Sequence, residues 1–396
     1  MPATPGASAG QILELVRSGR VRTRRELQET TGLSRSTLSL RMVQLTSAGY
    51  LRETGQVAGS TGRPAKILSF DEASHLVVAV DLGATHAHLA LLDGSGRVLR
   101  EQAGPLKFDT SPDEVIRSLG RRIGELVERS GRSPSELAGV GVGIPGPVRF
   151  STQRPNMPPL MPGWHDYPVT ERLRSALGVP VFLDNDANLM GLGEVRARHP
   201  EAASVLFVKV GTGIGAGVIL GGRPERGIAG GAGDIGHIRI VPESEGHRCS
   251  CGALGCLATE ASGGALVRQL TEQGRSVSSV EDVAQLIAAG DPLAVSLAER
   301  AGHLLGDVLA TSVALLNPGV LVLGGRLAAA GSQFLDAVRE SIFRRTVPLA
   351  TRELSIVLSA LGPDAAVQGA RHMVMDQAFS PDAVDARLAA REAQPA

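Results

Sequence analysis

The sequence predicts an α/β body of two similar halves, preceded by a small domain of helices and two short strands. The chain has 396 residues, which is enough for two or three domains of ordinary size. Apolar residues make up 43% of it and charged residues 20%, as in folded globular proteins. From about residue 76 onward, apolar strands alternate with helical segments, and this alternation is typical of an α/β fold.

Residues 1–71 are predicted to form a winged helix-turn-helix domain. Apolar side chains around Ile12 repeat with helical spacing, a second helix is expected over residues 23–30, and Ser34 can cap a third helix. Residues 51–70 then contain two short strands around a glycine-rich tip. Three helices followed by a two-stranded hairpin have the order of a winged helix-turn-helix.

The basic charge of the chain is concentrated in this first domain. The net charge of the whole chain is zero, yet residues 1–70 contain ten basic and four acidic side chains and carry +6. Such a charge supplies affinity for phosphates, and the early residues of a recognition helix reach base edges. Double-stranded DNA is therefore an expected partner, although the same polar face would also suit a helix that only contacts water. The expected DNA-contacting residues are Ser34, Arg35, Ser36, Thr37, Ser39, Arg41 and, at the tip of the wing, Arg63.

Three glycine turns in the body suggest a nucleotide site. The segments 80–85 and 210–215 both follow apolar strands and resemble each other, which suggests a duplicated unit, and a third turn follows another apolar strand. Backbone N–H groups in such turns can cradle phosphate oxygens, and Asp81 at a strand end could hold Mg²⁺ through water. The candidate nucleotide-binding residues are Asp81, Gly83, Thr85, Gly211, Thr212, Gly213, Gly324 and Gly325.

The three cysteines of the chain indicate a metal site. Cys249, Cys251 and Cys256 lie close together, and their odd number is poorly suited to a disulfide framework. A structural zinc ion takes four ligands, so either His237 or His247 would supply the fourth, and spacing alone does not choose between them. Buried free thiols are the alternative.

The acidic segment Asp184-Asn185-Asp186 lies where a strand meets a helix. Helix capping is the ordinary role for one of these side chains. An aspartate that accepts a proton from a sugar hydroxyl would also suit the end of a strand that faces a cleft.

Four of these motifs together resemble the ROK family, whose name stands for repressor, open reading frame and kinase. The motifs are the glycine turn 211–215, Asn-Asp-Ala-Asn at 185–188, Gly-Asp-Ile-Gly-His at 233–237 and the cysteine run 249–256. The resemblance extends from about Val77 to the C-terminus. The winged helix-turn-helix in front resembles the transcription-factor branch, since the sugar kinases of the family lack it.

The resemblance implies an actin-like, ribonuclease H-like body of two lobes of the ATPase type, with a sugar bound between them. We expect the first lobe over 75–188, joined by a C-terminal helix over about 365–390, and the second lobe with the zinc site over 189–364. The resemblance also implies that the ligands of a structural Zn²⁺ are His237, Cys249, Cys251 and Cys256.

The resemblance further implies which residues contact the sugar. They are Gly146, Asn156, Asn185, Asp186, Asp234, His237 and Glu260. Asp186 matches the general base of the kinases, and His237 would use one ring nitrogen for zinc and the other for a sugar hydroxyl. Asp234 stands where the family usually has glutamate, and Ala84 stands where the kinases usually have a second glycine.

The expected function is a sugar-responsive transcriptional regulator, a repressor of carbohydrate-utilisation genes that acts as a homodimer or homotetramer on an operator. Its effector would be a small sugar. The alternative is an ATP-dependent, glucokinase-like sugar kinase with an autoregulatory DNA-binding head, using Mg²⁺ and Asp186 as catalytic base. A third possibility is a regulator that binds another metabolite or a partner protein. The sequence shows neither an apolar stretch of about eighteen residues nor a leader, so a cytoplasmic protein without membrane association is expected.

Overall fold

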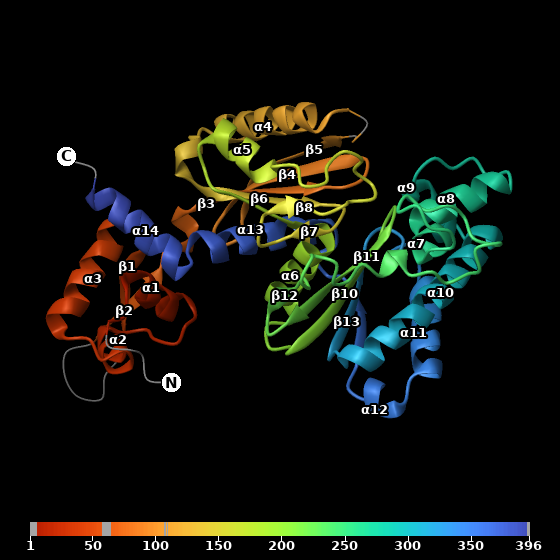
Figure 1. Cartoon of the computed structure of the whole chain (residues 1–396). Helices are drawn as coiled ribbons and strands as arrows, with labels where there is room; N and C mark the ends of the chain where they lie inside the picture. The colour runs from red at the N-terminus through yellow and green to blue at the C-terminus, as the bar shows by residue number, and fades with distance from the viewer. Residues whose placement is uncertain (1–5, 58–64, 107, 109, 394–396) are drawn as a thin grey trace.

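The computed structural model describes residues 6–57, 65–106, 108 and 110–393. Figure 1 shows a small N-terminal head in red, a first lobe in orange and yellow, and a second lobe in green and blue. Two helices at the C-terminal end of the chain return from the second lobe, pass the first lobe and reach the head. Within the described part of the chain, every helix is too short or too polar to cross a membrane.

The head has the predicted order of three helices and two strands. Their bounds are α1 Ala9–Arg17, α2 Arg24–Thr31, α3 Arg35–Ser47, β1 Leu51–Val57 and β2 Ala65–Phe70. Ser8, Thr23 and Ser34 cap the three helices, because each side-chain oxygen accepts a hydrogen bond from a free backbone N–H of the first turn. Gly32 ends α2 in the left-handed conformation that glycine adopts without strain.

The head is held together by the apolar faces of its helices. Leu38, Met42 and Leu45 of α3 are buried, as their helical spacing predicts. The strands β1 and β2 pair antiparallel, with Leu51 opposite Phe70. The expected wing tip with Arg63 lies outside the described residues.

The first lobe is built on a five-stranded sheet with the order β5-β4-β3-β6-β9. Its strands are β3 Leu76–Leu82, β4 His86–Asp93, β5 Val98–Pro105, β6 Leu137–Ile144 and β9 Val181–Asn185. Three consecutive antiparallel strands are followed by two parallel ones. The helices α4, Pro112–Glu128, and α5, Val169–Leu177, cover one face (Figure 1), and the short hairpin β7 Val148–Arg149 and β8 Arg154–Pro155 lies between β6 and α5 in the chain.

The second lobe repeats this topology, with the strand order β12-β11-β10-β13-β14. Its strands are β10 Ser204–Val210, β11 Ile214–Leu220, β12 Arg223–Glu225, β13 Val320–Gly324 and β14 Ser355–Leu358. Again three antiparallel strands precede two parallel ones, so the predicted duplication is confirmed at the level of sheet topology. Its helices are α7 Leu257–Ala261, α8 Gly263–Glu272, α9 Val280–Ala288, α10 Pro292–Leu316, α11 Ser332–Arg345 and α12 Pro348–Thr351.

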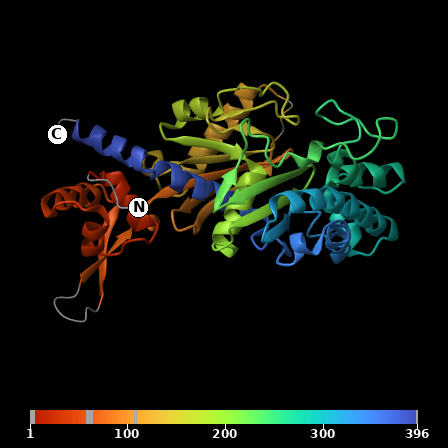
Figure 2. The same cartoon turned by 60° about the horizontal axis from the view of Figure 1, so that its bottom comes forward.

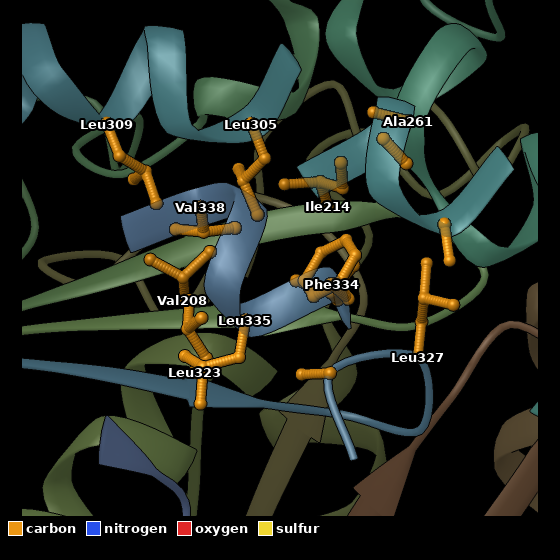
Figure 3. Close-up of a cluster of buried hydrophobic side chains, with 14 of the residues drawn as sticks. Val208, Ile214, Ala261, Leu305, Leu309, Leu323, Leu327, Phe334, Leu335 and Val338 are labelled. Atoms are coloured by element: carbon orange, nitrogen blue, oxygen red, sulfur yellow. The ribbon is translucent and has the colours of Figure 1, made fainter. Parts of the chain in front are cut away.

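One face of the second sheet forms the main core of this lobe with α10 and α11. Figure 3 shows Leu305 and Leu309 of α10 and Val338 of α11 directed toward Val208 and the neighbouring strand residues. These side chains are fully buried. At about 25 cal/mol per Å² of apolar surface removed from water, such a cluster is the main source of stability for the lobe.

Two helices, α6 Asp186–Arg198 and α13 Ala365–Ala378, form a layer between the two sheets. The helix α6 packs against β10 and β11 of the second sheet, while α13 packs against β3 and β6 of the first. The two helices approach so closely that a Cβ at Gly369 would overlap the backbone of Leu189, and a Cβ at Gly193 would overlap that of Ala365. Glycine at these positions is therefore a packing requirement.

The prediction of a single C-terminal helix over about 365–390 is wrong. The chain forms two helices there, α13 and α14 Pro381–Glu392. Proline has no N–H and collides with the preceding turn, so Pro381 can begin a helix but cannot continue one. After this break α14 packs against α1 of the head instead of a sheet, and Figure 2 shows it extending from the body alongside the head.

The head is attached to the C-terminal helices by polar and aromatic contacts. The backbone N–H of Gly10 donates to Asp385 Oδ1 at 2.8 Å, and Arg17 Nη1 donates to the carbonyl of Phe379 at 3.1 Å. The ring of His75 lies 4.5 Å from that of Phe379, between centroids. Burial lowers the pKa of His75 to about 4, so this histidine is neutral near pH 7 and acts as part of an aromatic cluster.

We predict that Gly369→Ala lowers the free energy of unfolding by about 1–3 kcal/mol or more, because the added methyl group forces α6 and α13 apart. Urea unfolding followed by circular dichroism measures this change. Gly124→Ala in α4 is the matched control, since a Cβ there would meet no described atom within 4 Å. That substitution should raise stability by up to about 1 kcal/mol through helix propensity. Equal effects of the two substitutions would contradict the close helix contact.

Candidate functional site

The junction between β9 and α6 presents the predicted Asn185 and Asp186. Asn185 caps α6, because its Oδ1 accepts a hydrogen bond from the backbone N–H of Asn188 at 3.1 Å. Its Nδ2 donates to the carbonyl of Gly146 at 3.0 Å, so two of the residues expected to contact the sugar are in direct contact. Asp186 is buried in the first turn of α6.

A lysine that the sequence analysis did not single out pairs with Asp186. The ammonium of Lys209, near the end of β10, forms an ion pair with Asp186 Oδ2 across the two lobes. Burial by itself lowers the pKa of Lys209, but the carboxylates of Asp186 and Asp81 raise it overall, so the lysine is charged. Lys209 is the only charged residue of its apolar strand, and this signal was available in the sequence.

Asp81 lies close to the same pair. Burial is the main cause that raises the pKa of its carboxyl, and the charge of Asp186 adds to the effect, while Lys209 opposes it. Its Oδ1 is enclosed and has no hydrogen-bond partner among the described residues. Asp81, the carboxylate that the sequence analysis considered for Mg²⁺, therefore lies near an ammonium group that is paired with Asp186, and this donor set does not fit a divalent ion as it stands.

A second ion pair joins the lobes next to Asp186. Arg226, which follows β12, donates from Nε to Asp184 Oδ2 at 2.8 Å and reaches the same oxygen from Nη2 at 2.6 Å. Its guanidinium carbon also lies 3.7 Å from the centre of the Phe150 ring. The Asp184 side chain is fully buried, so the arginine supplies the charge that it needs. The sequence places Asp184 beside the site but gives no signal for Arg226.

The other residues expected to contact a sugar lie on both lobes. Asn156 Nδ2 donates to the carbonyl of Ala229 at 2.9 Å, which links the loop after β8 to the segment that precedes Asp234. Asp234 Oδ1 lies 3.8 Å from Nε2 of His237. The shorter aspartate thus still faces the histidine ring.

Glu260 of α7 is engaged by His247 in this structure. Its Oε1 accepts hydrogen bonds from the backbone N–H of His247 at 3.1 Å and from the ring Nδ1 at 3.0 Å. Burial favours a raised pKa for Glu260, but these hydrogen bonds and the nearby ring lower the pKa overall. A sugar hydroxyl would therefore share this carboxylate with His247 or displace it.

A histidine and three cysteines form a compact set of metal-ligating atoms. The donor atoms of His237, Cys249, Cys251 and Cys256 all lie within 4.8 Å of one another. Cys249 Sγ is 3.3 Å from His237 Nδ1, and the sulfurs of Cys251 and Cys256 are 3.7 Å apart. Bonds of about 2.3 Å from zinc to sulfur in a tetrahedron place two sulfurs about 3.8 Å apart, so the set fits Zn²⁺.

The chemistry of the cluster also favours a cation. Burial is the main cause that raises the pKa of the Cys256 thiol, to about 12, and the neighbouring sulfurs add to it. Three thiolates at this place need a compensating positive charge, which zinc supplies. Of the two histidines that spacing left open, His237 lies with the cysteines, whereas the ring of His247 contacts Glu260.

The glycine turns lie at the ends of strands, as predicted. Several of their glycines, however, are required because neighbouring atoms leave no room for a Cβ. A Cβ at Gly324 would press against the ring of Phe207, and one at Gly325 would overlap the backbone of Val210. The N–H of Gly83 donates to the carbonyl of His86 at 2.8 Å within the hairpin turn. These positions therefore have structural reasons to be glycine.

The second turn contacts the start of α8. The N–H groups of Gly263 and Gly264 donate to the carbonyls of Gly211 and Thr212, at 2.8 and 3.2 Å. In contrast, a Cβ at Gly213 would meet none of the described atoms within 4 Å. In the first turn, Thr85 is exposed.

The expected DNA-contacting residues at the start of α3 are mostly exposed. Ser34 to Thr37 and Ser39 lie at the surface. Arg41 is half-buried instead, and its Nη1 donates to Gln44 Oε1 at 3.1 Å. The amide of Gln44 in turn donates to Glu392 Oε1 of α14 at 2.7 Å, so Arg41 belongs to the junction between the head and the C-terminal helix.

Comparison with known proteins identifies the family of the chain. The ROK family profile matches residues 77–377, and the chain belongs to this family. The fold is therefore the actin-like, ribonuclease H-like fold of two lobes that the resemblance implied. Within the family, the described head and body together match a transcriptional regulator, whereas glucokinases match the body alone.

Two curated relatives, a repressor and a glucokinase, illustrate this difference in coverage. The xylose repressor of Caldicellulosiruptor bescii is 27% identical over 383 residues, covering 93% of this chain and 95% of that protein. The glucokinase of Halalkalibacterium halodurans is 29% identical and covers 76% of this chain and 95% of that protein.

Two solved structures of ROK family proteins show the same difference in coverage. The crystal structure of a ROK family transcriptional regulator, a homolog of the E. coli MLC protein, superposes with a TM-score of 0.79 at 27% identity, covering 96% of this chain and 98% of that chain. A ROK family glucokinase from Streptomyces griseus, in complex with glucose and AMPPNP, superposes with a TM-score of 0.67 at 27% identity, over 75% of this chain and 98% of that chain.

We predict that the purified protein contains one zinc ion per chain and that Cys251→Ser reduces this content to well below one. Serine keeps the size of the side chain but supplies a much poorer ligand for zinc. Metal analysis after dialysis measures the content, and Ser250→Ala between the two cysteines is the control. A variant that retains a full equivalent of zinc would show that Cys251 is not a ligand.

Proposed function

We propose that this chain is a sugar-responsive transcriptional repressor that binds double-stranded DNA through its head and a small sugar between its lobes. The observation that carries the proposal is the organisation of the chain. A winged helix-turn-helix head precedes a ROK body, and this combination matches repressors over most of their length. A homodimer or homotetramer would present two or more heads to a palindromic operator.

The head supports DNA binding through the exposed start of α3. Ser34 caps this helix, so the residues that follow stand at its N-terminal end, where recognition helices contact base edges. Arg35 is exposed there and can donate two hydrogen bonds to a guanine. The charge of +6 on residues 1–70 supplies affinity for phosphates.

The body supports sugar binding through carboxylates, amides and one histidine from both lobes. Asn185 and Gly146 are already joined on the first lobe, and Asp234 faces His237 on the second. Zinc on Nδ1 of His237 would fix the ring and leave Nε2 toward Asp234 and the sugar. The metal thus serves structure, and the neighbouring polar groups bind hydroxyls.

The α6–α13 layer provides a physical route from sugar to DNA. Asp186 is the first residue of α6, which packs on α13 through Gly369 and Gly193. The chain continues from α13 into α14, which packs on α1 of the head. A sugar that binds one arrangement of the lobes more tightly would therefore favour one placement of the heads. The free energy of this shift equals the difference in sugar affinity between the two arrangements.

We predict that Arg35→Ala weakens binding to the operator by about 5- to 150-fold, which corresponds to the loss of about 1–3 kcal/mol of base recognition. Fluorescence anisotropy with the DNA upstream of the protein's own gene, at fixed salt, measures this affinity. Arg129→Ala removes the same charge from an exposed position of the body and should leave the affinity nearly unchanged. An unchanged affinity in Arg35→Ala would remove this residue from the interface, and wild-type protein without sequence-specific binding would refute the repressor.

A second candidate function is ATP-dependent phosphorylation of a sugar. The observation that favours it is Asp186 at the end of β9, together with glycine turns at the ends of strands in both lobes. Glucokinases also match the body over nearly their whole length. Thermal-shift measurements with sugars and sugar phosphates distinguish the repressor and the kinase from a regulator whose body binds another metabolite, since only a ligand that binds the native state raises the Tm.

We predict that a sugar which releases the operator from wild-type protein does so in Asp186→Asn only at about 10- to 100-fold higher concentration. A hydrogen bond to a charged acceptor contributes about 1.5–3 kcal/mol, and the amide forfeits it. Titration of the protein–operator complex measures the effect, with the exposed Glu128→Gln as control. Formation of sugar phosphate from ATP by the wild type, and its loss in Asp186→Asn, would instead favour the kinase.

A further inference from the structure

An ion pair and a third charged side chain lie where the two lobes join. Asp81 comes from β3 of the first lobe, Asp186 begins α6, and Lys209 comes from β10 of the second lobe. Asp186 is only 4% exposed, and its ion pair with Lys209 crosses between the lobes. Asp81 is close enough to both for their charges to act on its ionisation.

The lysine stem lies along the second glycine turn. A Cβ at Gly211 would stand 3.8 Å from Lys209 Cε, so the aliphatic part of the lysine passes beside the backbone that was expected to hold phosphates. From there the ammonium reaches Asp186 Oδ2. The lysine stem therefore lies beside the glycine turn while its ammonium is held by Asp186.

Without this ammonium, the buried carboxylate of Asp186 would lose its ion-pair partner while the half-buried carboxylate of Asp81 stays nearby. Two like charges in a poorly hydrated site repel strongly, and such a pair either keeps a proton or binds a cation. Carboxylate oxygens are the ligands of hard divalent ions such as Mg²⁺ and Mn²⁺. The enclosed Oδ1 of Asp81, which lacks a hydrogen-bond partner among the described residues, is a donor atom for such an ion.

We propose that Lys209 is a built-in cation that takes the place which a divalent metal ion would otherwise occupy between Asp81 and Asp186. The ammonium neutralises Asp186 as a base through Oδ2, while Oδ1 accepts the backbone N–H of Ala187 at 2.7 Å, and the lobe junction becomes independent of metal and nucleotide. Effector binding then needs no Mg²⁺, and the chemistry of phosphoryl transfer lacks its metal site. The inference concerns the charges of the body and does not depend on the repressor function.

The experiment is to measure Mn²⁺ binding by electron paramagnetic resonance of the free ion. Full-length protein is first loaded with one equivalent of Zn²⁺, so that the His237–cysteine cluster is filled. Wild type and Lys209→Arg, which keeps the charge, should leave Mn²⁺ free. Lys209→Met should bind about one equivalent at least tenfold more tightly than wild type, and Lys209→Met with Asp81→Asn should lose that binding again.

Thermal unfolding gives a second measurement on the same proteins. Addition of Mg²⁺ or Mn²⁺ should raise the Tm of Lys209→Met and leave the Tm of wild type and of Lys209→Arg unchanged, because only a state that binds the ion is stabilised. Lys209→Gln replaces Lys209→Met if the latter does not fold.

Two results would overturn the proposal. One is Mn²⁺ binding by wild type as tight as that of Lys209→Met and equally sensitive to Asp81→Asn, which would show that the lysine does not exclude the metal. The other is a folded Lys209→Met or Lys209→Gln that still binds the operator but takes up no Mn²⁺. Operator binding separates this failure from a failure of the proposed function.

Discussion

The close contact between α6 and α13 is the constraint on which the arrangement of the whole chain depends. Each helix belongs to the layer that covers the inner face of one sheet, and their backbones nearly touch where Gly369 and Gly193 stand. A side chain at either position would push the two sheets apart. Because Asp186 opens α6, and α13 leads into the helix that holds the head, this contact also sets the distance from the candidate sugar site to the proposed DNA-binding surface of the head.

Two ion pairs between the lobes act at the same end of α6. Asp184 with Arg226 and Asp186 with Lys209 both join the end of β9 or the start of α6 to the second sheet. Buried ion pairs add little net stability compared with apolar packing, but the loss of one partner is costly because the other charge stays buried. These ion pairs therefore contribute little to the stability of either lobe but favour one position of the lobes relative to each other. A closure controlled by a ligand would need such a preference between positions.

The fold could be predicted well from the sequence, because its signals are local and repeated. Capping residues such as Ser34, the spacing of Leu38 and Met42, and the similar glycine turns each reflect the backbone geometry of one element. The candidate metal cluster was also visible in the sequence, since its cysteines are neighbours in the chain. The contacts of Arg226 and Lys209 were not predicted, because they depend on two lobes meeting and no pattern within one segment encodes the partner. His247 shows the same limit, since only the folded loop directs it to Glu260 and not to the cysteines.

The break at Pro381 explains how one body can position a separate head. A continuous helix would have kept the end of the chain in line with α13, whereas the proline lets α14 turn onto α1. At this turn Phe379 packs with the rings of His75 and Phe70, and Arg17 donates to its carbonyl. His75 stands directly before β3, whose far end carries Asp81, so the head is connected to the charged lobe junction by a strand as well as by a helix. The helix from α13 and the strand β3 thus meet at the same aromatic cluster, so a displacement of the lobes would be transmitted to the head along both elements.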